Sequence, residues 1–585
     1  MKYILGVNVG HDAGVALLCD DLLIEAINEE RFSRQKGHRG IPYLSVNYIK
    51  EKYKISNFDK VVTVSANGKY KTALFSIDKN INLRKRRKQK YFASVLFYKI
   101  GLTELYDEVR GFYKYFRGFI LHRKISLILG ELFPGTPIIN LNHHDSHAWT
   151  ALAFTDDRDG RFIITLDGEG DGESGSISSF QNNKLVRLAT TDKKSSLGIL
   201  YSKVTQLLAM RENEHEFKVM GMAPYARQGS DREPLEYFRK ILRVNRKTLS
   251  LSSNFDMKFA HLDMLVQNFL NYRFDELALA IQNFTEETVL ELLSETINTY
   301  DCKKISVSGG VFMNIKMNQR LLETLDLEDF QVTPSCGDES LAIGAAYYGF
   351  HATNGFTPRR INDLYLGTEY NNNDIFKCIS SIQNQKVSIT FFDENLKIEK
   401  EIARLLSVGE IVARFNGRME WGARGLGNRS ILANPSIFGI VQKINDSIKC
   451  RDFWMPFAPS ILLEDSVKYL YNERGYFSPY MALGFHTKLS EQSSMQAAIH
   501  PSDKTCRPQM VSYENNSKYY NLIKYFKEIT GESVILNTSF NLHGEPIVES
   551  PLDAVKTFIN SDLKYLAIGD YLLTKVDQVL SGEYQ

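Results

Sequence analysis

The sequence lacks the features that mark an exported or membrane-spanning protein. Its six cysteines are scattered and form no Cys-x-x-Cys pair, which is typical of a reducing cytoplasm rather than of a disulfide framework. No uninterrupted apolar run approaches the length of about 18 residues that spans a bilayer. Polar residues also interrupt the apolar N-terminal stretch before a secretory signal is complete. We therefore expect a cytoplasmic protein with no membrane segment.

An excess of charge of one sign is absent as well. The chain has 71 Lys and Arg against 69 Asp and Glu, which leaves a net charge of +2 over 585 residues. This balance argues against a nucleic-acid coat protein and against an acidic tail. Hydrophobic residues make up 43% of the chain, so a large globular core is expected. At about 150 residues per domain, the length allows about two to four domains.

A pattern of strand, polar loop, strand, turn and strand occurs twice. The first copy begins at Ile4 and has a glycine-bearing loop at 10–14, and the second begins at Phe162 and has its loop at 167–172. Glycine lets backbone N–H groups approach phosphates closely. Two ordinary hairpins would explain either copy alone, but the repeat predicts a nucleotide-binding α/β fold with two phosphate loops.

A third glycine loop, Gly309 to Asn314, follows the apolar strand Ile305 to Ser308 and precedes a predicted helix that ends near Leu325. A strand, a Gly-Gly pair and a helix in this order can hold an adenosine or ribose edge. A tight helix entry without a ligand would have the same pattern, so both interpretations stay open for this loop.

The chain is expected to divide near residue 360. A polar stretch, His351 to Asn373, separates the predicted domains 1–360 and 361–585. Within the first domain, residues 69–134 interleave basic and aromatic residues, including the run Arg84 to Lys88. Because the net charge is small, we expect a lid or an acceptor-binding insertion here rather than an RNA-binding surface.

Two histidines have the spacing of metal ligands. His143 and His147 stand four residues apart, so on a helix capped by Asn142 they share one face and can reach one metal ion. A lone His-x-x-x-His is more often structural. The loop carboxylates Asp167 and Asp338 could complete the set, and two imidazoles with one or two carboxylates suit a divalent transition metal such as iron or zinc.

Three further residues of the first domain are chemical candidates. His11 and Asp12 directly follow a buried strand, where they could form an Asx turn or serve as a base near a reacting hydroxyl. Lys218 stands in the run Glu216 to Gly221, which reads as an acid and a base beside a glycine turn. Its ammonium could neutralise a phosphate or an acidic partner, or only solvate the surface.

The second domain concentrates cations around a glycine-rich loop. Guanidinium groups that project from one loop form bidentate sites for phosphate or carboxylate oxygens, although surface pairing with acids would explain any one of them. Hydroxyl and amide donors follow a predicted strand nearby. The members of this set are Arg418, Arg424, Arg429, Lys449, Arg451, Arg507, Ser539 and Asn541.

These motifs together resemble, over essentially the whole chain, the O-carbamoyltransferases of nodulation-factor decoration and of antibiotic biosynthesis of the tobramycin and cephamycin type. As an ordered set they form a specific signal. They are Gly10-His11-Asp12, His143-His144-Asp145-Ser146-His147-Ala148, Asp167-Gly168-Glu169-Gly170-Asp171-Gly172, Glu216-Phe217-Lys218-Val219-Met220-Gly221, Ser308-Gly309-Gly310-Val311, Gly337-Asp338-Glu339, Gly427-Asn428-Arg429-Ser430, Asn537-Thr538-Ser539-Phe540-Asn541 and Gly544-Glu545-Pro546-Ile547-Val548.

The resemblance implies a fold and a division of labour. The N-terminal domain would be a duplicated actin-like (ASKHA) α/β domain, similar to the transferase that makes threonylcarbamoyl-adenosine in tRNA, and the C-terminal domain a YrdC-like α/β domain. The C-terminal domain would form carbamoyl adenylate from carbamoyl phosphate and ATP. The N-terminal domain would then deliver the carbamoyl group to an acceptor hydroxyl with the help of an iron-type metal.

Carried over position by position, the resemblance gives each candidate a role. The metal ligands would be His143, His147, Asp167 and Asp338, holding Fe²⁺, with Zn²⁺ or Mn²⁺ as alternatives. The base would be His11 or Asp12. Contacts to the adenylate in the first domain would come from Gly168, Gly170, Asp171, Gly172, Lys218, Gly309, Gly310 and Asn314. Contacts to carbamoyl phosphate and ATP, the latter with Mg²⁺, would come from Arg418, Arg424, Lys449, Arg451, Arg507, Ser539 and Asn541.

The expected partners are ATP, carbamoyl phosphate and a hydroxyl-bearing small molecule or sugar of natural-product or glycoconjugate biosynthesis. No nucleic acid or membrane is expected, and a homodimer is compatible with the sequence. The main alternative is a tRNA threonylcarbamoyl-transferase-like enzyme, which would need a tRNA-sized basic face. An actin-like sugar kinase would leave the histidine pair unexplained, and a nucleotide-sensing regulator would not turn over carbamoyl phosphate and ATP.

Overall fold

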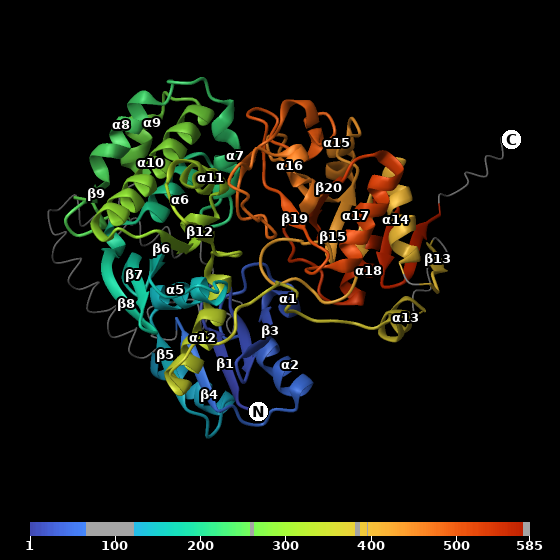
Figure 1. Ribbon diagram of the computed structural model, residues 1–585, viewed down its shortest axis with the longest axis horizontal. Coiled ribbons are helices and arrows are strands. Elements are labelled where there is room, and N and C mark those ends of the chain that lie inside the picture. The colour runs from blue at the N-terminus through green and yellow to red at the C-terminus, as the bar shows by residue number, and fades with distance from the viewer. Residues whose placement is uncertain (66–121, 255, 258–261, 381–386, 395, 577–585) are drawn as a thin grey trace. The chain divides into compact units, whose positions relative to one another are not determined.

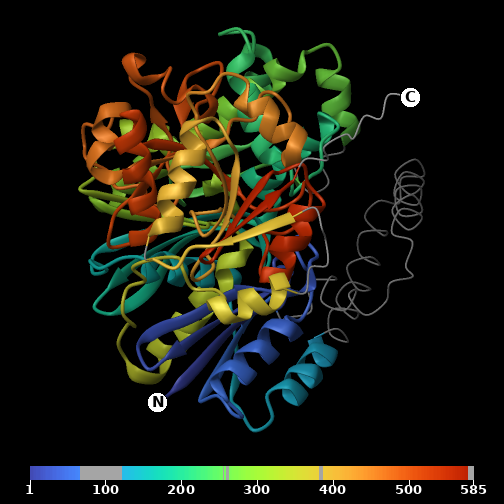
Figure 2. The same ribbon diagram turned by 90° about the vertical axis from the view of Figure 1, so that its right-hand side faces the viewer.

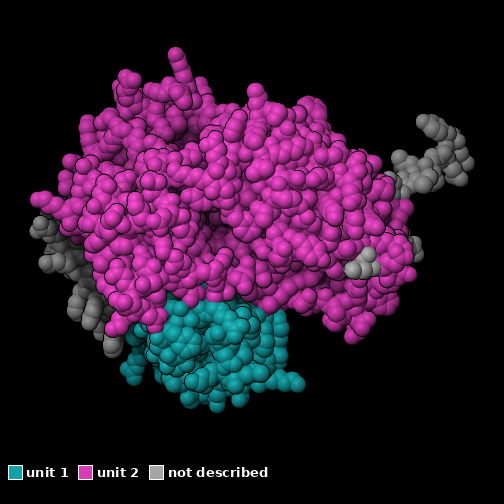
Figure 3. Space-filling view, in the orientation of Figure 1, with its two compact units in different colours: residues 1–33, 37–153, 338–359 teal, residues 34–36, 154–337, 360–585 magenta. Residues whose placement is uncertain are grey.

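The computed structural model describes residues 1–65, 122–254, 256–257, 262–380, 387–394 and 396–576 (Figure 1). The chain forms two compact units. Unit 1 comprises residues 1–33, 37–153 and 338–359, and unit 2 comprises residues 34–36, 154–337 and 360–585 (Figure 3). The predicted domain limits of 1–360 and 361–585 stay a prediction. Of the predicted insertion at 69–134, residues 69–121 lie outside the described residues, and 122–132 are helical.

Unit 1 is built on a five-stranded mixed sheet in the order β3-β2-β1-β4-β5. The first three strands are antiparallel neighbours, and the last two run parallel to β1. The strands are β1 (Tyr3–Asn8), β2 (Gly14–Cys19), β3 (Leu22–Asn28), β4 (Lys60–Val64) and β5 (Ile138–Leu141), and the helices are α1 (Glu30–Ser33), α2 (Tyr43–Tyr53), α5 (His143–Ala153) and α12 (Leu341–Asn354).

Alternate residues of β1 serve the two faces of this sheet. Leu5 and Val7 lie in the core cluster that includes residues of α2. Gly6 points the other way, where a Cβ would stand only 1.9 Å from the Ala342 carbonyl oxygen of α12. Because both faces are covered, β1 is apolar from Ile4 to Val7 instead of alternating with polar residues.

Helices α5 and α12 meet at a second glycine. A Cβ on Gly344 would lie 1.9 Å from the carbonyl oxygen of Ser146, so the two backbones are closer than any larger residue permits. The Ser146 hydroxyl donates to the Leu341 carbonyl at 2.6 Å, and the Thr150 hydroxyl donates to that of Ser340 at 3.0 Å. These contacts fix α5 against the start of α12.

The first part of unit 2 repeats the sheet of unit 1. Its strand order is β12-β11-β6-β7-β8, the same arrangement with the same sense of neighbours. The strands are β6 (Arg161–Gly170), β7 (Glu173–Gln181), β8 (Lys184–Asp192), β11 (Lys304–Ser308) and β12 (Asp329–Val332). Even the turns correspond: Asp12 and Asp171 are both left-handed, with φ of 50° and 54°, as are Asp20 and Asn182, with φ of 50° and 49°. The predicted internal repeat is therefore confirmed.

Two local predictions in this part are wrong. The polar stretch 167–172 is not a loop throughout, because β6 continues to Gly170 across an irregular register and only Asp171 and Gly172 turn. The run from Glu216 is not a glycine turn but the helix α7 (Glu216–Met222). Gly221 stands in that helix because another backbone passes close by, since a Cβ there would lie 3.4 Å from the Trp454 carbonyl oxygen.

Helices and a short hairpin complete this part of unit 2. They are α6 (Leu197–Leu207), α8 (Arg232–Ile241), α9 (Leu262–Phe269), α10 (Phe274–Tyr300), α11 (Ile315–Thr324), β9 (Arg243–Asn245) and β10 (Ser250–Ser252). The long α10 packs against α6, α7, α8 and α11.

The C-terminal part of unit 2 has an eight-stranded mixed sheet in the order β13-β22-β21-β14-β15-β20-β16-β19 (Figure 2). Helices cover both faces, with α14 and α17 in one core cluster and α13, α15 and α18 in the other. The strands are β13 (Val387–Phe391), β14 (Val412–Phe415), β15 (Arg429–Ala433), β16 (Ala458–Leu462), β19 (Gln509–Val511), β20 (Val534–Ser539), β21 (Tyr565–Ile568) and β22 (Tyr571–Lys575), with the two-stranded pair β17 (Phe485–His486) and β18 (Thr505–Cys506). The helices are α13 (Asn372–Ser380), α14 (Lys397–Ser407), α15 (Ile440–Ile444), α16 (Ser466–Tyr469), α17 (Ser517–Thr530) and α18 (Pro551–Ile559).

The predicted fold class is confirmed. A duplicated actin-like α/β arrangement, with the same five-strand order in each copy, is followed by the predicted YrdC-like region, which is a mixed α/β domain. Among the helices that the structure describes, none combines the length and the apolar composition needed to cross a membrane.

The close approach of α5 and α12 yields a stability prediction. Gly344→Ala should lower the free energy of unfolding by about 2 kcal/mol or more, because the new methyl group has no room beside the Ser146 carbonyl. Urea unfolding of the full chain measures it. Gly130→Ala, in the helical stretch 122–132 with nothing within 4 Å of the new Cβ, is the control and should leave stability unchanged or raise it by up to about 1 kcal/mol. Equal unfolding midpoints for the two variants would contradict the packing argument.

Candidate functional site

Three of the four predicted metal ligands come together in unit 1. The Asn142 side chain accepts hydrogen bonds from the backbone N–H groups of His144 and Asp145 at 2.9 and 3.2 Å, which confirms the predicted cap and starts α5 at His143. His143 and His147 therefore share one face of the helix, with ring centroids 4.8 Å apart. Asp338, just before α12, completes the group.

The donor set fits a divalent cation. The Nε2 atoms of His143 and His147 lie 3.4 and 3.7 Å from Oδ1 of Asp338, and both imidazoles are fully buried. Among the residues that the structure describes, none donates a hydrogen bond to that buried Oδ1. Two imidazole nitrogens and a carboxylate oxygen that converge in this way are typical ligands of zinc, iron or manganese.

Asp167, the fourth predicted ligand, belongs to unit 2, and its part in a metal site stays a prediction. Its Oδ1 accepts a hydrogen bond from the Gly310 N–H at 3.2 Å. Gly309 is left-handed, with φ of 97°, and passes so close to β6 that a Cβ would stand 2.2 Å from the Leu166 carbonyl oxygen. The second and third glycine motifs are thus in direct contact.

The remaining residues predicted to contact the adenylate lie in the same two glycine motifs or elsewhere in unit 2. Gly168 and Gly172 have open space on the side of a Cβ, as a ligand-facing backbone requires. The Asn314 side chain is hydrogen-bonded within the protein. It caps α11 by accepting from the Met317 N–H at 3.1 Å, and it exchanges two amide hydrogen bonds with Gln282 at 2.8 and 3.0 Å. Adenylate binding by Gly168, Gly170, Asp171, Gly172, Lys218, Gly309, Gly310 and Asn314 stays a prediction.

His11 and Asp12 form a hydrogen-bonded pair between Nδ1 and Oδ2 in the loop after β1. Burial lowers the pKa of His11, but the hydrogen bond and charge of Asp12, with the charge of Asp338, outweigh it and hold the pKa above its usual value. The pair leaves Nε2 of His11 as the ring atom not bonded to Asp12.

Asn8 holds this loop in place, a role that was not predicted from the sequence. Its buried side-chain amide donates to the carbonyl oxygens of His11 at 2.8 Å and Asp338 at 3.0 Å. One side chain therefore holds the His11 loop beside the start of α12. The available signal was a polar residue at the last position of an otherwise apolar strand.

In the C-terminal part of unit 2, four of the predicted cations lie close enough for their charges to shift one another's pKa. Burial first, then the charges of Arg451 and Lys36, hold the pKa of Lys449 well below its usual value. Burial and Arg424 lower the pKa of Arg451 to about 10, and burial with Arg424 and Arg451 lowers that of Arg507. We call Arg424, Lys449, Arg451 and Arg507 the cationic cluster.

Lys36 was not predicted to belong here. It lies in the short segment 34–36, which belongs to unit 2 although residues 33 and 37 belong to unit 1. The neighbouring Arg34 fastens this segment by donating to the carbonyl oxygens of Pro546 and Ile547 at 2.9 and 2.7 Å. No local pattern near residue 36 could have revealed a neighbour so distant in sequence.

Ser539 and Asn541 support Lys449. The Lys449 ammonium donates to the Ser539 carbonyl oxygen and to the Asn541 side-chain oxygen, the latter at 2.8 Å, and the Ser539 hydroxyl donates to the same Asn541 oxygen at 2.7 Å. In contrast, the buried Nε of Arg507 meets no acceptor among the described residues. A guanidinium with an unused buried donor, surrounded by like charges, is suited to an anionic ligand.

Two other predicted cations are bonded to the protein backbone. Arg418 donates to the carbonyl oxygens of Leu366 and Gly367 at 3.0 and 2.9 Å. Arg429 is fully buried, donates to the Asn416 carbonyl oxygen at 2.9 Å and stacks 3.6 Å from the centroid of Phe415. Both contacts are structural, and a ligand role for Arg418 stays a prediction.

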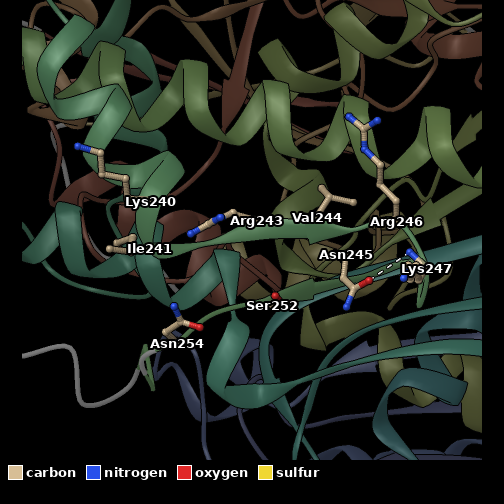
Figure 4. A pocket seen from close by; sticks show the side chains of 9 residues that line it. All are labelled: Lys240, Ile241, Arg243, Val244, Asn245, Arg246, Lys247, Ser252 and Asn254. Carbon is tan, nitrogen blue, oxygen red and sulfur yellow. Dashed lines mark hydrogen bonds between the residues drawn. The ribbon is translucent and has the colours of Figure 1, made fainter.

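A separate hollow of about 450 Å³ lies at the end of α8 and the β9–β10 hairpin (Figure 4). Basic side chains rim it, including Arg243 and Lys247, while Arg246 is paired with Glu291 at 2.7 Å. None of the predicted site residues lines this hollow.

The repeated actin-like fold, the histidine and carboxylate group and the cationic cluster define a two-part enzyme with one site suited to a metal cation and another suited to anions. Two family models match the sequence, one described as carbamoyltransferase N-terminus over residues 3–347 and one as carbamoyltransferase C-terminus over residues 403–575. The chain therefore belongs to the carbamoyltransferase family, and it is a carbamoyltransferase.

Relatives match along most of the chain. It is similar to MJ1051 of Methanocaldococcus jannaschii, with 31% identity over 98% of this chain and 100% of the relative. It is also similar to nodulation protein NolNO of Sinorhizobium fredii (29% identity, 97% of this chain, 79% of the relative) and NolO of Bradyrhizobium diazoefficiens (29%, 74% and 79%).

The metal-site geometry predicts that His147→Ala lowers the metal affinity of the purified full chain by at least about tenfold, since even changes behind the ligands commonly cost about 10- to 100-fold. Elemental analysis after dialysis against Fe²⁺ or Zn²⁺ measures it. His486→Ala removes an exposed histidine and is the control. Equal metal content in both variants would rule out the site.

The cationic cluster predicts a pH dependence. Because burial and the neighbouring cations hold the pKa of Lys449 well below its usual 10.5, its ammonium loses the proton at a lower pH than an ordinary lysine does, and the binding of inorganic pyrophosphate weakens as the pH rises through that pKa. Titration calorimetry on the full chain measures the affinity. Lys449→Met should bind more weakly at pH values below that pKa and show a flatter pH profile, whereas identical profiles would contradict the assignment.

Proposed function

We propose that the protein is an ATP-dependent O-carbamoyltransferase that forms carbamoyl adenylate at the cationic cluster and transfers the carbamoyl group to a hydroxyl of a small molecule or sugar. The observation that carries this proposal is the cluster itself. One buried and three half-buried cations, whose charges and burial lower the pKa of three of them, are costly to hold together unless an anion binds among them. Carbamoyl phosphate and the ATP phosphates supply such charges, and the family implies a carbamoyl donor.

The first reaction balances when water is included. Carbamoyl phosphate, ATP and water give carbamoyl adenylate, pyrophosphate and inorganic phosphate. Water cleaves carbamoyl phosphate to carbamate and inorganic phosphate, and a carbamate oxygen then attacks the α-phosphorus of ATP and displaces pyrophosphate. Arg424, Arg451 and Arg507 neutralise the phosphate oxygens during this attack, and Lys449 is held in place by Ser539 and Asn541. Mg²⁺ would accompany ATP, as it does in most nucleotide sites.

The second reaction transfers the carbamoyl group from the adenylate to the acceptor oxygen and releases AMP. Asp12 holds Nδ1 of His11, which leaves Nε2 to take the proton of the acceptor hydroxyl. His143, His147 and Asp338, with Asp167 as the proposed fourth ligand, would hold a divalent metal, for which Fe²⁺ is our expectation and Zn²⁺ or Mn²⁺ the alternatives. Such a metal, when bound, polarises a carbonyl oxygen as a Lewis acid.

The test follows both reactions with the full chain. Pyrophosphate release from ATP should require carbamoyl phosphate, and mass spectrometry should find one carbamoyl group on a hydroxyl acceptor from a panel of sugars and small molecules. A parallel arm with unmodified tRNA separates the threonylcarbamoyl-transferase-like alternative. Pyrophosphate release that ignores carbamoyl phosphate would refute the proposal.

His11→Ala separates the two reactions. It should leave pyrophosphate release within about twofold of the wild type while transfer to the acceptor falls by about 10²- to 10⁴-fold, the usual contribution of a general base. Normal transfer by both His11→Ala and Asp12→Ala would show that neither residue is the base.

A further inference from the structure

Within unit 2, α7 and the 3₁₀ turn that follows it, Ala223–Tyr225, contact two loops of the C-terminal region. The first loop, 450–457, follows Lys449 and contains Arg451. The second loop, 499–504, leads into β18 (Thr505–Cys506), which ends immediately before Arg507. The two loops therefore carry or flank three of the four members of the cationic cluster.

The first loop is held by an ion pair and by close packing. Nζ of Lys218 lies 2.8 Å from Oδ2 of Asp452, the residue next to Arg451. One turn further along α7, Gly221 leaves room for the Trp454 backbone. The ring of Tyr225 meets that of Phe453 edge to face, with centroids 6.0 Å apart.

The second loop is held by hydrogen bonds to the same helix and turn. His500 is buried, and its Nδ1 accepts from the Ser502 N–H at 3.2 Å, so its Nε2 donates to the Gly221 carbonyl oxygen at 2.8 Å. The Ser502 hydroxyl donates to the Pro224 carbonyl oxygen at 2.6 Å. The α7 segment thus binds both loops through separate contacts.

We propose that α7 and its following turn position the anion-binding loops, and that Lys218 is a positioning residue for the C-terminal site rather than a phosphate ligand. Its ammonium is paired with Asp452, which limits its attraction for a phosphate and fixes the loop that bears Arg451. Errors of about 1 Å in the placement of binding groups can cost about 10²-fold in rate. The inference rests on the proposed function for the identity of the anion only.

Lys218→Met should weaken the binding of inorganic pyrophosphate to the full chain about fivefold, which is the size of effect expected when a partly exposed ion pair is lost. It should raise KM for carbamoyl phosphate in pyrophosphate release more than it lowers kcat. The charge swap Lys218→Asp with Asp452→Lys should recover most of both losses. A phosphate ligand at position 218 predicts the opposite, because the swap places a carboxylate there.

Lys203→Met is the matched control. Lys203 pairs with Glu212 at 3.7 Å, and their side chains are 21% and 33% exposed, close to the 18% and 34% of Lys218 and Asp452. It should leave pyrophosphate affinity unchanged. Equal affinity of wild type and Lys218→Met, or a swap that binds more weakly than Lys218→Met, would overturn the inference. Wild type that binds pyrophosphate but never releases it from ATP would instead refute the proposed function.

Discussion

Burying a charged group costs free energy unless an opposite charge, a hydrogen-bond acceptor or a ligand replaces the lost water, and this constraint organises the whole molecule. Where charge is structural, opposite charges and acceptors within the protein supply most of the compensation: Arg161 pairs with Asp329, and Arg414 donates to the Gly427 carbonyl oxygen at 2.8 Å, although its Nε, like that of Arg507, meets no acceptor among the described residues. Where the charge belongs to a candidate functional site, the protein itself compensates it only in part. Asp338 faces two imidazoles, and Arg507 faces other cations.

The two sites at which charge is incompletely compensated differ in the sign of that charge and in the contacts that hold their residues in position. In unit 1, the tight packing of α5 on α12 and the Asn8 amide hold a histidine and carboxylate group beside the His11 loop. In unit 2, Arg424 and Arg451 of the cationic cluster lie on loops, Lys449 ends a helical turn and Arg507 directly follows β18. Contacts from α7 add a further restraint, so a helix of the actin-like repeat contributes to the geometry of the C-terminal region.

The sequence predicted what depends on local pattern. The repeated strands, the cap at Asn142 and the shared face of His143 and His147 follow from periodicity and spacing over a few residues. It could not separate Arg429, which is bonded to backbone carbonyls, from Arg507, which is not, because both are arginines near glycine-rich loops. Lys36 and the partner of Lys218 were also out of reach, since each depends on contacts between segments hundreds of positions apart.

The membership of residues 34–36 in unit 2 bears on how such enzymes can be dissected or recombined. A fragment that begins at residue 361 would retain the arginines yet lose Lys36, the Arg34 anchor and the α7 segment. Chimaeras between relatives would for the same reason need to exchange these pieces together. The cationic cluster and the contacts that hold it come from three separated stretches of the chain, so the cluster is not a transferable module.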